Sequence, residues 1–262
     1  MKQMKQKLLN RLVHPKHNKY IFLPLDFGFY KQPQDFILNS ESLMNSVATH
    51  SFGSPLMHKG LIKTYGKKLV EAKKSFFLHI TGSTSLCTIA DKSQISQVKD
   101  AMDLGAIGVS LTIYLGNPHE LKMLEMLGKV CSEADNYNLL VYAMMYVVDV
   151  NKQGKLYEKV SLDEILYAAR VGYEIGVDIV ETRLPEKCTD FSIVKKLCPI
   201  PIILGDRSNY SDKEYVENIQ VAVKNGYDGV SISNRSLKTS FNVLSNLTTN
   251  GFSKNMSKEQ KV

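Results

Sequence analysis

Several features that define whole classes of protein are missing from this sequence. No apolar run reaches the roughly 18 residues that a membrane-spanning helix needs, so we expect no membrane partner. The six histidines are dispersed, and the four cysteines (Cys87, Cys131, Cys188 and Cys198) show no C-x-x-C spacing. This scatter predicts neither a disulfide framework nor a metal site, and it favours a reduced, cytoplasmic setting. No G-x-G-x-x-G motif follows the first expected strand, so we predict no dinucleotide site and no cofactor.

Positive charge is in moderate excess, with a formal net charge of +7, and much of it lies on lysines near the two termini. Nucleic-acid binding calls for a basic face with interleaved aromatic side chains, and no such block is present, so no nucleic-acid partner is expected. The excess is compatible with attraction of an anionic substrate, and equally with solubility alone. The basic segment at residues 1–17 has no long apolar core after it, so we do not expect it to be a signal peptide. Its apolar stripe of Leu8, Leu9 and Leu12 predicts a capping helix instead.

Length and pattern predict an α/β fold. The chain has 262 residues, 44% hydrophobic and 23% charged, which fits one large α/β barrel or two small domains. Eight short apolar runs alternate with helical segments, and this is the pattern of βα units in a parallel sheet. Eight such units close most naturally into a (β/α)8 TIM barrel, and a doubly wound open sheet is the alternative. The expected strands are residues 20–26, 54–57, 76–80, 107–114, 139–145, 177–181, 201–204 and 229–233.

The domain boundaries follow from this pattern. Residues 1–18 are expected to cap the barrel, residues 19–247 to form it as a single domain, and residues 248–262 to be a polar, disordered tail. Between the strands, residues 94–104 and 237–247 are expected to be helices, and the stretch containing Asp149 and residues 152–155 a linker. The helix after that linker is expected to begin at Ser161, because its spacing to Glu164 matches a capping box.

The sixth expected strand ends in a polar cluster that includes Glu181, Thr182 and Arg183. Alternation along a strand places Glu181 and Arg183 on one side and Thr182 on the other. If Glu181 faces inward, its carboxylate lies buried near the carboxyl end of the strand. An unpaired charge is energetically costly there, so we expect either a pairing partner or a functional role. A catalytic interpretation and a structural one, in which Glu181 pairs with Arg183 or a neighbouring lysine, both stay open.

Active sites of (β/α)8 barrels lie at the carboxyl ends of the strands. That rule selects two carboxylates, a phenol, a histidine and several basic or small loop residues, which together suit proton transfer beside a carbonyl group of an anionic substrate. Each also has a purely structural interpretation, such as a cap for Asp26, a core tyrosine for Tyr146 or a hydrogen-bonded core histidine for His79. The residues selected are Asp26, His79, Thr81, Tyr114, Tyr146, Glu181, Arg183, residues 205–208 and residues 233–235.

Several segments that carry these residues share one resemblance. They are Leu23-Pro-Leu-Asp26-Phe-Gly28, Ala143-Met-Met-Tyr146, the fifteen residues from Ala168 to Thr182, Pro201-Ile-Ile-Leu-Gly205 and Gly229-Val-Ser-Ile-Ser-Asn-Arg235. In this order they resemble the "P-M-D-H-G", "x-M-Y-P-R-G", "A-A-R-x-G-x-E-L-G-A-D-I-V-K-T", "P-V-V-x-x-G-G" and "G-x-x-x-G-R-N" segments of the archaeal-type class I fructose-bisphosphate aldolases and their relatives in the deoxyribose-phosphate aldolase superfamily. The likeness extends from about Leu9 to Leu247, and the fifteen-residue block is its most specific part.

The departures from that family bear on the chemistry. Its Schiff-base lysine stands in the "D-I-V-K-T" segment, where this chain has Glu181, and a carboxylate cannot form an imine. The "P-R-G" after the tyrosine is replaced by Val147-Val148-Asp149, and Asp206 replaces a phosphate-loop glycine and would repel phosphate. Asp26 and Tyr146 are retained. In the segment that corresponds to "G-x-x-x-G-R-N", Arg235 keeps a basic residue, displaced by one position from the arginine of the family.

The resemblance therefore implies a divergent aldolase-like enzyme that acts on a small keto or sugar-derived anionic substrate without the usual lysine imine. Glu181 is expected as the general base, Tyr146 as the acid, and Asp26 as a residue that positions a hydroxyl group.

Whether another lysine, such as Lys59, restores an imine stays open. The alternative is a catalytically silent paralogue that binds a metabolite or a partner. A homo-oligomer is implied by the resemblance only. The expected substrate-binding residues are His79, Arg183, Gly205, Asp206, Arg207, Ser233, Asn234 and Arg235.

Overall fold

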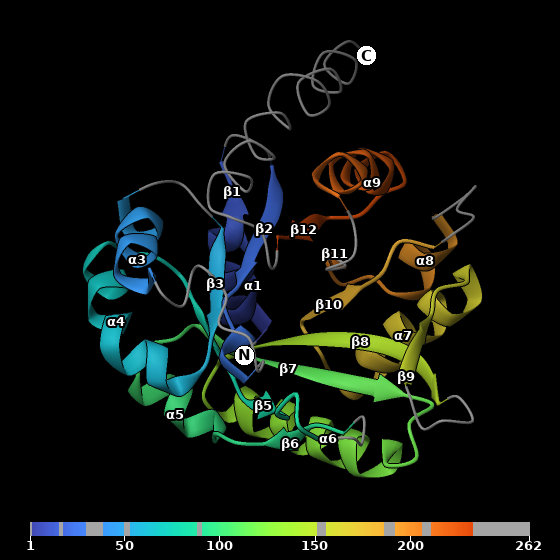
Figure 1. Cartoon of the computed structure of the whole chain (residues 1–262), viewed down its shortest axis with the longest axis horizontal. Coiled ribbons are helices and arrows are strands. Elements are labelled where there is room, and N and C mark those ends of the chain that lie inside the picture. Colours follow the sequence, from blue (N-terminus) through green and yellow to red (C-terminus); the bar gives the residue numbers. More distant parts are fainter. Residues whose placement is uncertain are drawn as a thin grey trace.

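Eight parallel strands close into a barrel in the computed structural model, with helices around the outside (Figure 1). The structure describes residues 2–15, 18–29, 39–49, 53–87, 91–150, 156–185, 192–205 and 211–232. Strand order around the barrel is β2–β12–β11–β10–β8–β7–β4–β3, and β3 pairs back onto β2. Closure confirms the (β/α)8 fold and excludes the open sheet. The barrel strands are β2 (Lys19–Pro24), β3 (Ser54–Met57), β4 (Phe77–His79), β7 (Gly108–Leu115), β8 (Leu140–Val150), β10 (Ile179–Thr182), β11 (Ile202–Gly205) and β12 (Gly229–Ser231).

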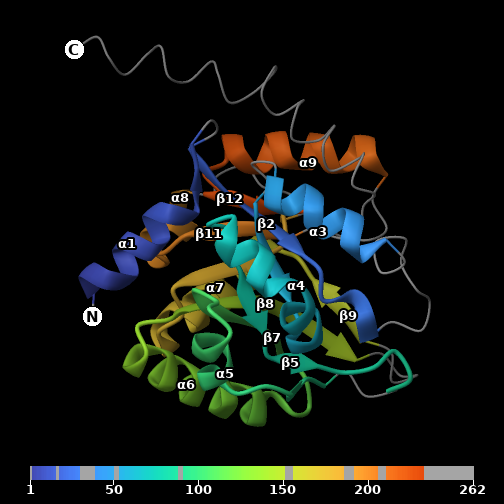
Figure 2. The ribbon, with the colours of Figure 1, turned by 90° about the vertical axis from the view of Figure 1, so that its left-hand side faces the viewer.

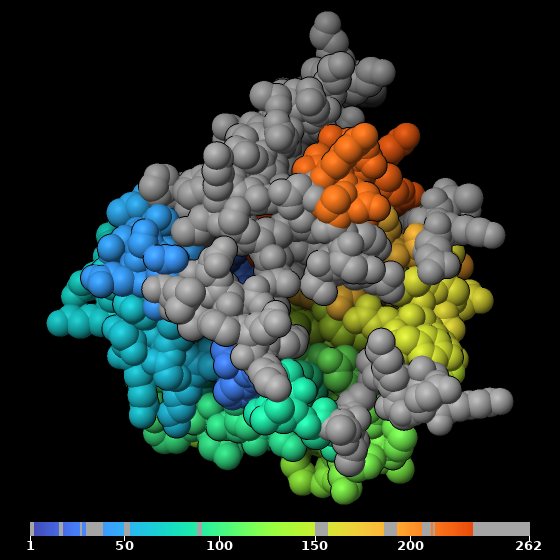
Figure 3. All heavy atoms as spheres, in the orientation of Figure 1, coloured from blue at the N-terminus to red at the C-terminus, as the bar shows by residue number. Residues whose placement is uncertain are grey.

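A helix follows each barrel strand from β2 to β11. These helices are α3 (Ser40–Thr49), α4 (Lys59–Glu71), α5 (Val98–Asp103), α6 (Glu120–Asn136), α7 (Leu162–Ile175), α8 (Ser192–Leu197) and α9 (Asp212–Lys224). Helix α7 begins at the predicted capping box, in which the Ser161 hydroxyl accepts from the Glu164 amide and Glu164 accepts from the Ser161 amide. Seen as filled spheres, α3 (blue) and α9 (orange) form separate parts of the molecule's edge (Figure 3).

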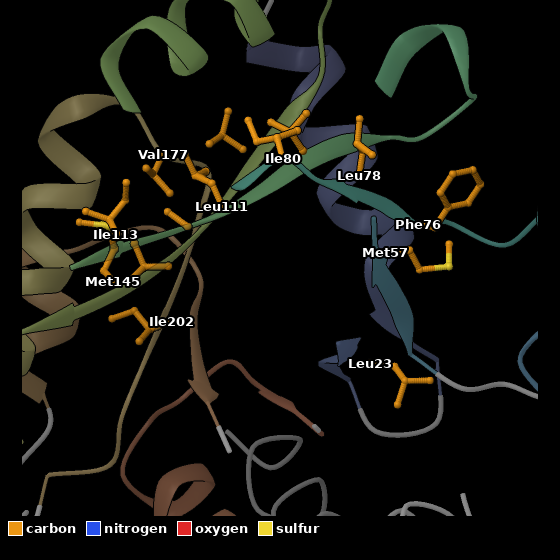
Figure 4. Packing of buried hydrophobic residues seen from close by; sticks show 14 of the residues in the cluster. Leu23, Met57, Phe76, Leu78, Ile80, Leu111, Ile113, Met145, Val177 and Ile202 are labelled. Carbon is orange, nitrogen blue, oxygen red and sulfur yellow. The ribbon is translucent and has the colours of Figure 1, made fainter. Parts of the chain in front are cut away.

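The core has two layers because side chains alternate along each strand. On β8, Ala143 and Met145 belong to the layer between the strands and the helices, part of which Figure 4 shows. Tyr142, Met144 and Tyr146 belong to the inner layer, inside the barrel. Aromatic rings fill much of that interior, including Phe22, Phe77 and Tyr142, whose centroids lie 4.6 to 5.9 Å apart.

Helix α1 (Lys2–Leu12) lies at the amino-terminal end of the barrel, and β9 (Leu156–Lys159) lies at the opposite end (Figure 2). Leu12 is buried in the inner layer, and Leu8 and Leu9 pack against it. The Lys5 ammonium binds Asp178 at 2.8 Å, and Asp178 also accepts the Val141 amide at 2.8 Å, so α1 is tied to the starts of β8 and β10. After α1, the two residues of β1 (Val13–His14) pair antiparallel with β2.

Two local predictions are wrong. Residues 94–104 are not one helix, because Ser93–Gln94 (β6) pairs antiparallel with Thr81–Gly82 (β5) and α5 begins only at Val98. The expected linker around Asp149 belongs instead to a hairpin, in which β8 continues to Val150 and pairs antiparallel with β9. The β-branched Val147, Val148 and Val150 favour a strand, whereas the linker prediction followed the polar residues 152–155, which lie outside the described residues.

The expected helix at residues 237–247 and the tail at residues 248–262 also lie outside the described part of the chain. Within the described part, no helix combines the length and the apolarity needed to span a membrane.

Candidate active site

Glu181 lies inside the barrel at the carboxyl end of β10 and is only 3% exposed. In the register of β10 with β8, Glu181 is opposite Met144, so the inward-facing Tyr142 and Tyr146 stand two residues before and after that position. The Tyr142 hydroxyl donates to Oε2 of Glu181 at 2.5 Å, and the Tyr146 hydroxyl donates to Oε1. Each carboxylate oxygen therefore accepts a hydrogen bond from a tyrosine, which lowers the energetic cost of burying this charge.

Both phenols are held in the protonated, donating form. Burial raises the pKa of Tyr142 well above its ordinary value, and the neighbouring Glu181 carboxylate raises it further. Burial likewise raises the pKa of Tyr146, Arg183 opposes the shift, and Glu181 reinforces it. Tyr142 is fully buried, whereas Tyr146 is 7% exposed and lies four residues nearer the carboxyl end of β8. Tyr146 is therefore the phenol better placed to reach a bound molecule.

Arg183 covers the ring of Tyr146. Its Cζ lies 4.0 Å from the Tyr146 ring centroid, and its Nε and Nη2 donate to the two carboxylate oxygens of Glu158 at 2.8 and 2.7 Å. Burial acts to lower the pKa of Arg183, but Tyr146, Glu158 and Glu181 outweigh it, so the pKa is raised and the guanidinium stays charged. Sequence reasoning missed Glu158, because it lies on β9, which carries no strong strand pattern of its own.

Gly205, the last residue of β11, lies against both charged groups. A Cβ atom at this position would stand 2.5 Å from Oε1 of Glu181 and 2.8 Å from Nη1 of Arg183. The missing side chain thus leaves the space that Glu181 and Arg183 occupy. The same contact shows that the two side chains lie on one side of the strand end, as alternation predicts.

A second polar group lies at the carboxyl ends of β2 and β4. His79 is 2% exposed, its Nδ1 lies 3.0 Å from Oγ of Ser110, and its Nε2 lies 3.3 Å from Oγ1 of Thr81 and 3.6 Å from Oδ2 of Asp26. Burial lowers the pKa of His79 to about 4, against the opposing influence of Asp26, so the ring is neutral at neutral pH. His58 lies beside this group, with its ring nitrogens 3.2 and 3.1 Å from the carbonyl oxygens of His79 and Asp26.

One carboxylate oxygen of Asp26 has no hydrogen-bond partner among the described residues. This oxygen is Oδ1, which is buried, while Oδ2 faces His79. A buried carboxylate oxygen without a partner is costly, and a bound hydroxyl or ammonium group would satisfy it.

Lys92 lies near both polar groups, and the sequence patterns did not single it out. Its Nζ lies 5.9 Å from the ring centroid of Tyr114, and the Tyr114 ring lies 6.4 Å from that of Tyr146. Burial lowers the pKa of Lys92, opposed by the carboxylate of Asp26. Lys59, the alternative amine considered from the sequence, instead binds Asp100 at 2.7 Å.

The predicted site residues therefore fall into two clusters. Tyr146, Glu181, Arg183 and Gly205 come together around β8, β10 and β11, and Asp26 and His79 come together around β2 and β4. The structural interpretation in which Glu181 caps its strand by pairing with Arg183 is replaced by the two tyrosine bonds and the Arg183–Glu158 pair. Asp206, Arg207, Ser233, Asn234 and Arg235 lie outside the described residues.

In chemical terms, the first cluster offers a carboxylate that can accept a proton, a phenol that can donate one, and a fixed positive charge. Among the residues that the structure describes, no three His, Cys, Asp or Glu side chains gather as a metal-binding group.

Comparisons with known proteins agree with this architecture. The chain is 28% identical over 227 residues to 2-amino-3,7-dideoxy-D-threo-hept-6-ulosonate synthase 1 of Archaeoglobus fulgidus, covering 86% of this chain and 82% of that protein. It is 23% identical over 228 residues to the class 1 fructose-bisphosphate aldolase of Thermoproteus tenax, covering 84% of each. The structure matches the crystal structure of an archaeal fructose 1,6-bisphosphate aldolase with a TM-score of 0.78 at 21% identity, covering 94% of this chain and 98% of that one. The model of the DeoC/LacD aldolase family matches residues 20–238, so the chain belongs to that family and is an aldolase-type enzyme.

Proposed function

We propose that this enzyme makes or breaks a carbon–carbon bond, or enolises its substrate, by proton transfer between Glu181 and Tyr146. The substrate class is a small keto or sugar-derived anion. Family membership supports the reaction class, and the names of the relatives, a hept-6-ulosonate synthase and fructose-bisphosphate aldolases, support the substrate class. The observation that carries the proposal is the hydrogen bond from the Tyr146 hydroxyl to the buried Glu181 carboxylate at the carboxyl end of the barrel.

The proposed step transfers two protons. The Glu181 carboxylate takes a proton from the carbon next to the substrate carbonyl, and the Tyr146 phenol gives its proton to the carbonyl oxygen. Two electrons from the broken C–H bond form the new C=C bond of the enol. The existing hydrogen bond then returns the proton from Glu181 to Tyr146, so both groups regain their starting forms.

The remaining residues are proposed to bind and orient the substrate. Arg183 stabilises negative charge that develops on the carbonyl oxygen, because Glu158 and the Tyr146 ring hold its guanidinium in place. The unpartnered Oδ1 of Asp26 accepts a substrate hydroxyl, within reach of His79. From the resemblance, Gly205, Asp206, Arg207, Ser233, Asn234 and Arg235 contact the anionic group of the substrate.

The expected setting is also part of the proposal. The enzyme is proposed to act in the cytoplasm, as a homo-oligomer, on a substrate whose anionic group is a carboxylate or a phosphate. Asp206 disfavours phosphate, because two negative charges at short distance repel each other. Comparing the affinities of a phosphorylated and a carboxylated ketone tests this preference. Tighter binding of the phosphorylated ketone would contradict it.

The direct test is exchange of solvent deuterium into a panel of hydroxyketone phosphates and 2-keto acids. We expect exchange in the wild type and a loss of about 10²–10⁴-fold in Glu181→Gln and in Tyr146→Phe. Tyr142→Phe is the matched control, since Tyr142 also donates to Glu181 but is fully buried. Equal losses in both tyrosine variants would show that the bonds only hold Glu181 in place.

A catalytically silent paralogue is the second candidate. It is favoured by the fact that both oxygens of Glu181 already accept hydrogen bonds from protein groups, as in a purely structural buried carboxylate. Absence of exchange across the panel, together with measurable binding of one of its members, would select this candidate.

A further inference from the structure

We propose that Lys92 is a catalytic residue whose amine forms an imine with the keto group of the substrate. This inference rests on the proposed function, because it requires a keto substrate. The imine supplies the electron acceptor that Glu181 cannot. It places that role in the loop after β4, which β7 and β8 separate from β10 around the barrel.

The backbone around Lys92 is held at the carboxyl end of the barrel. Directly after Lys92, β6 pairs with β5, with Gln94 opposite Thr81, and β5 continues the chain from β4. Directly before it, Oδ1 of Asp91 accepts the Lys92 amide at 2.8 Å, and Oδ2 of Asp91 binds Nδ1 of His119 at 2.9 Å. These contacts fix the start of the Lys92 side chain, which is half-buried.

From this position, the ammonium group is directed to the aromatic residues that line the mouth. Its Nζ lies 5.9 Å from the Tyr114 ring centroid, and Tyr114 lies 6.4 Å from Tyr146, the proposed acid. The guanidinium of Arg183 lies over the ring of Tyr146, with its Cζ 4.0 Å from the ring centroid. A small ketone over these two rings therefore lies between the Lys92 amine and the Glu181–Tyr146 pair.

The surroundings of Lys92 suit a nucleophilic amine. An amine attacks a carbonyl only in its unprotonated form, and burial favours that form by lowering the pKa of the lysine. The Asp26 carboxylate is the principal opposing influence, and its Oδ1 has no partner among the described residues. Asp26 is therefore available to take the proton that the amine loses when it attacks.

The other described lysines are less suitable. Lys5 binds Asp178 and Lys195 binds Asp228. Each aspartate immediately precedes a barrel strand and so lies at the amino-terminal end of the barrel. Burial also lowers the pKa of Lys19 and Lys74, but these residues begin or precede β2 and β4, at that same end. Among the described lysines with a lowered pKa, Lys92 is the one on the side where barrel enzymes act.

Imine formation transfers protons among Lys92, Asp26 and Tyr146. The Lys92 nitrogen adds its lone pair to the carbonyl carbon and loses a proton to Asp26, while the carbonyl oxygen takes a proton from Tyr146. Asp26 returns its proton to the resulting hydroxyl group, which leaves as water, and a protonated C=N bond remains. When the neighbouring C–H or C–C bond breaks, its electron pair moves toward the imine nitrogen. Glu181 accepts the proton of the C–H bond, or in the C–C case the proton of the hydroxyl group on the departing carbon, and passes it along the existing hydrogen bond to the Tyr146 phenolate. Water then releases the product and restores the amine.

The experiment is reduction with borohydride in the presence of dihydroxyacetone phosphate or pyruvate, followed by peptide mapping. We expect the peptide that contains Lys92 to gain the mass of the ketone less one oxygen atom. In Lys92→Arg, which keeps the charge but cannot form an imine, we expect no adduct and a loss of exchange of about 10²-fold or more. Lys59→Arg is the matched control and should keep both the adduct and the exchange, because Lys59 binds Asp100.

Several outcomes would overturn the inference while leaving the proposed function intact. They are an adduct on another lysine, exchange of a ketone that leaves no adduct on Lys92, and full exchange in Lys92→Arg. If no ketone exchanges, the proposed function itself fails. A second arm needs no ketone: trace acetylation across a pH series should label Lys92 at lower pH than the exposed Lys67. Labelling of both over the same pH range would refute a reactive amine at position 92.

Discussion

Glu158 binds Arg183 through both of its carboxylate oxygens, 2.8 and 2.7 Å from the guanidinium nitrogens Nε and Nη2. The pair joins β9 to the end of β10 and places the guanidinium 4.0 Å from the ring centre of Tyr146. A planar guanidinium that meets a carboxylate through two parallel bonds is held in orientation as well as position. The hairpin of β8 and β9 is thus a structural support for the charge beside Glu181.

Replacing Glu158 by glutamine should loosen Arg183 and weaken catalysis. One charge-assisted acceptor is lost from a pair whose side chains are 14% and 23% exposed, so we expect a stability loss of about 1–3 kcal/mol in urea unfolding. Glu125→Gln is the control, since its pair with Lys129 is exposed and screened by solvent, so its loss should change the stability little. Equal losses in the two variants would mean that the Glu158–Arg183 pair has no special role.

Gly205→Ala should reduce activity more than it reduces folding. The added methyl group would overlap Oε1 of Glu181 and Nη1 of Arg183, at 2.5 and 2.8 Å, so both groups must move. We expect a stability loss of about 1–3 kcal/mol and a clear loss of deuterium exchange. Gly128→Ala is the matched control, because nothing lies within 4 Å of its added Cβ and alanine favours the helix by about 0.5–1 kcal/mol. Full exchange in Gly205→Ala would show that the contact is unimportant for the reaction.

His79 should make the fold sensitive to mild acid. Its pKa is lowered from 6.5 to about 4, so below about pH 6.5 the unfolded chain binds a proton that the folded chain does not. Stability is therefore retained above pH 6.5 and falls as the pH drops toward 4, by about 2 kcal/mol at pH 5. We expect His79→Gln to lose less stability between about pH 7.5 and pH 5 than the wild type does. His58, whose pKa burial also lowers, should leave a smaller residual dependence. An unchanged pH dependence in His79→Gln would contradict the assignment.

Asp26→Asn should lower the pKa of its basic neighbours. The Asp26 carboxylate raises the pKa of His58, His79 and Lys92 against the effect of burial, and a neutral amide cannot do so. In pH-dependent acetylation, Lys92 of this variant should react at lower pH than in the wild type, although proton acceptance by Asp26 is lost and exchange should fall. A shift of the labelling curve to higher pH would show that Asp26 does not interact with Lys92.

The amino-acid sequence by itself determined the βα alternation, the strand sites, the capping box at Ser161 and the inward side of Glu181, because each depends on local periodicity. It also predicted that the carboxyl ends of the strands lie together, since parallel strands present these ends at one side of a barrel. Only the tertiary structure decided what Glu181 and Arg183 bind. Tyr146 and Glu158 are separated from these partners by 35 and 25 residues, and their contacts depend on the β8–β10 register and the β8–β9 hairpin. The place of Lys92 among the aromatic residues of the mouth arises in the same way, because pairing of two-residue strands leaves almost no periodic signal.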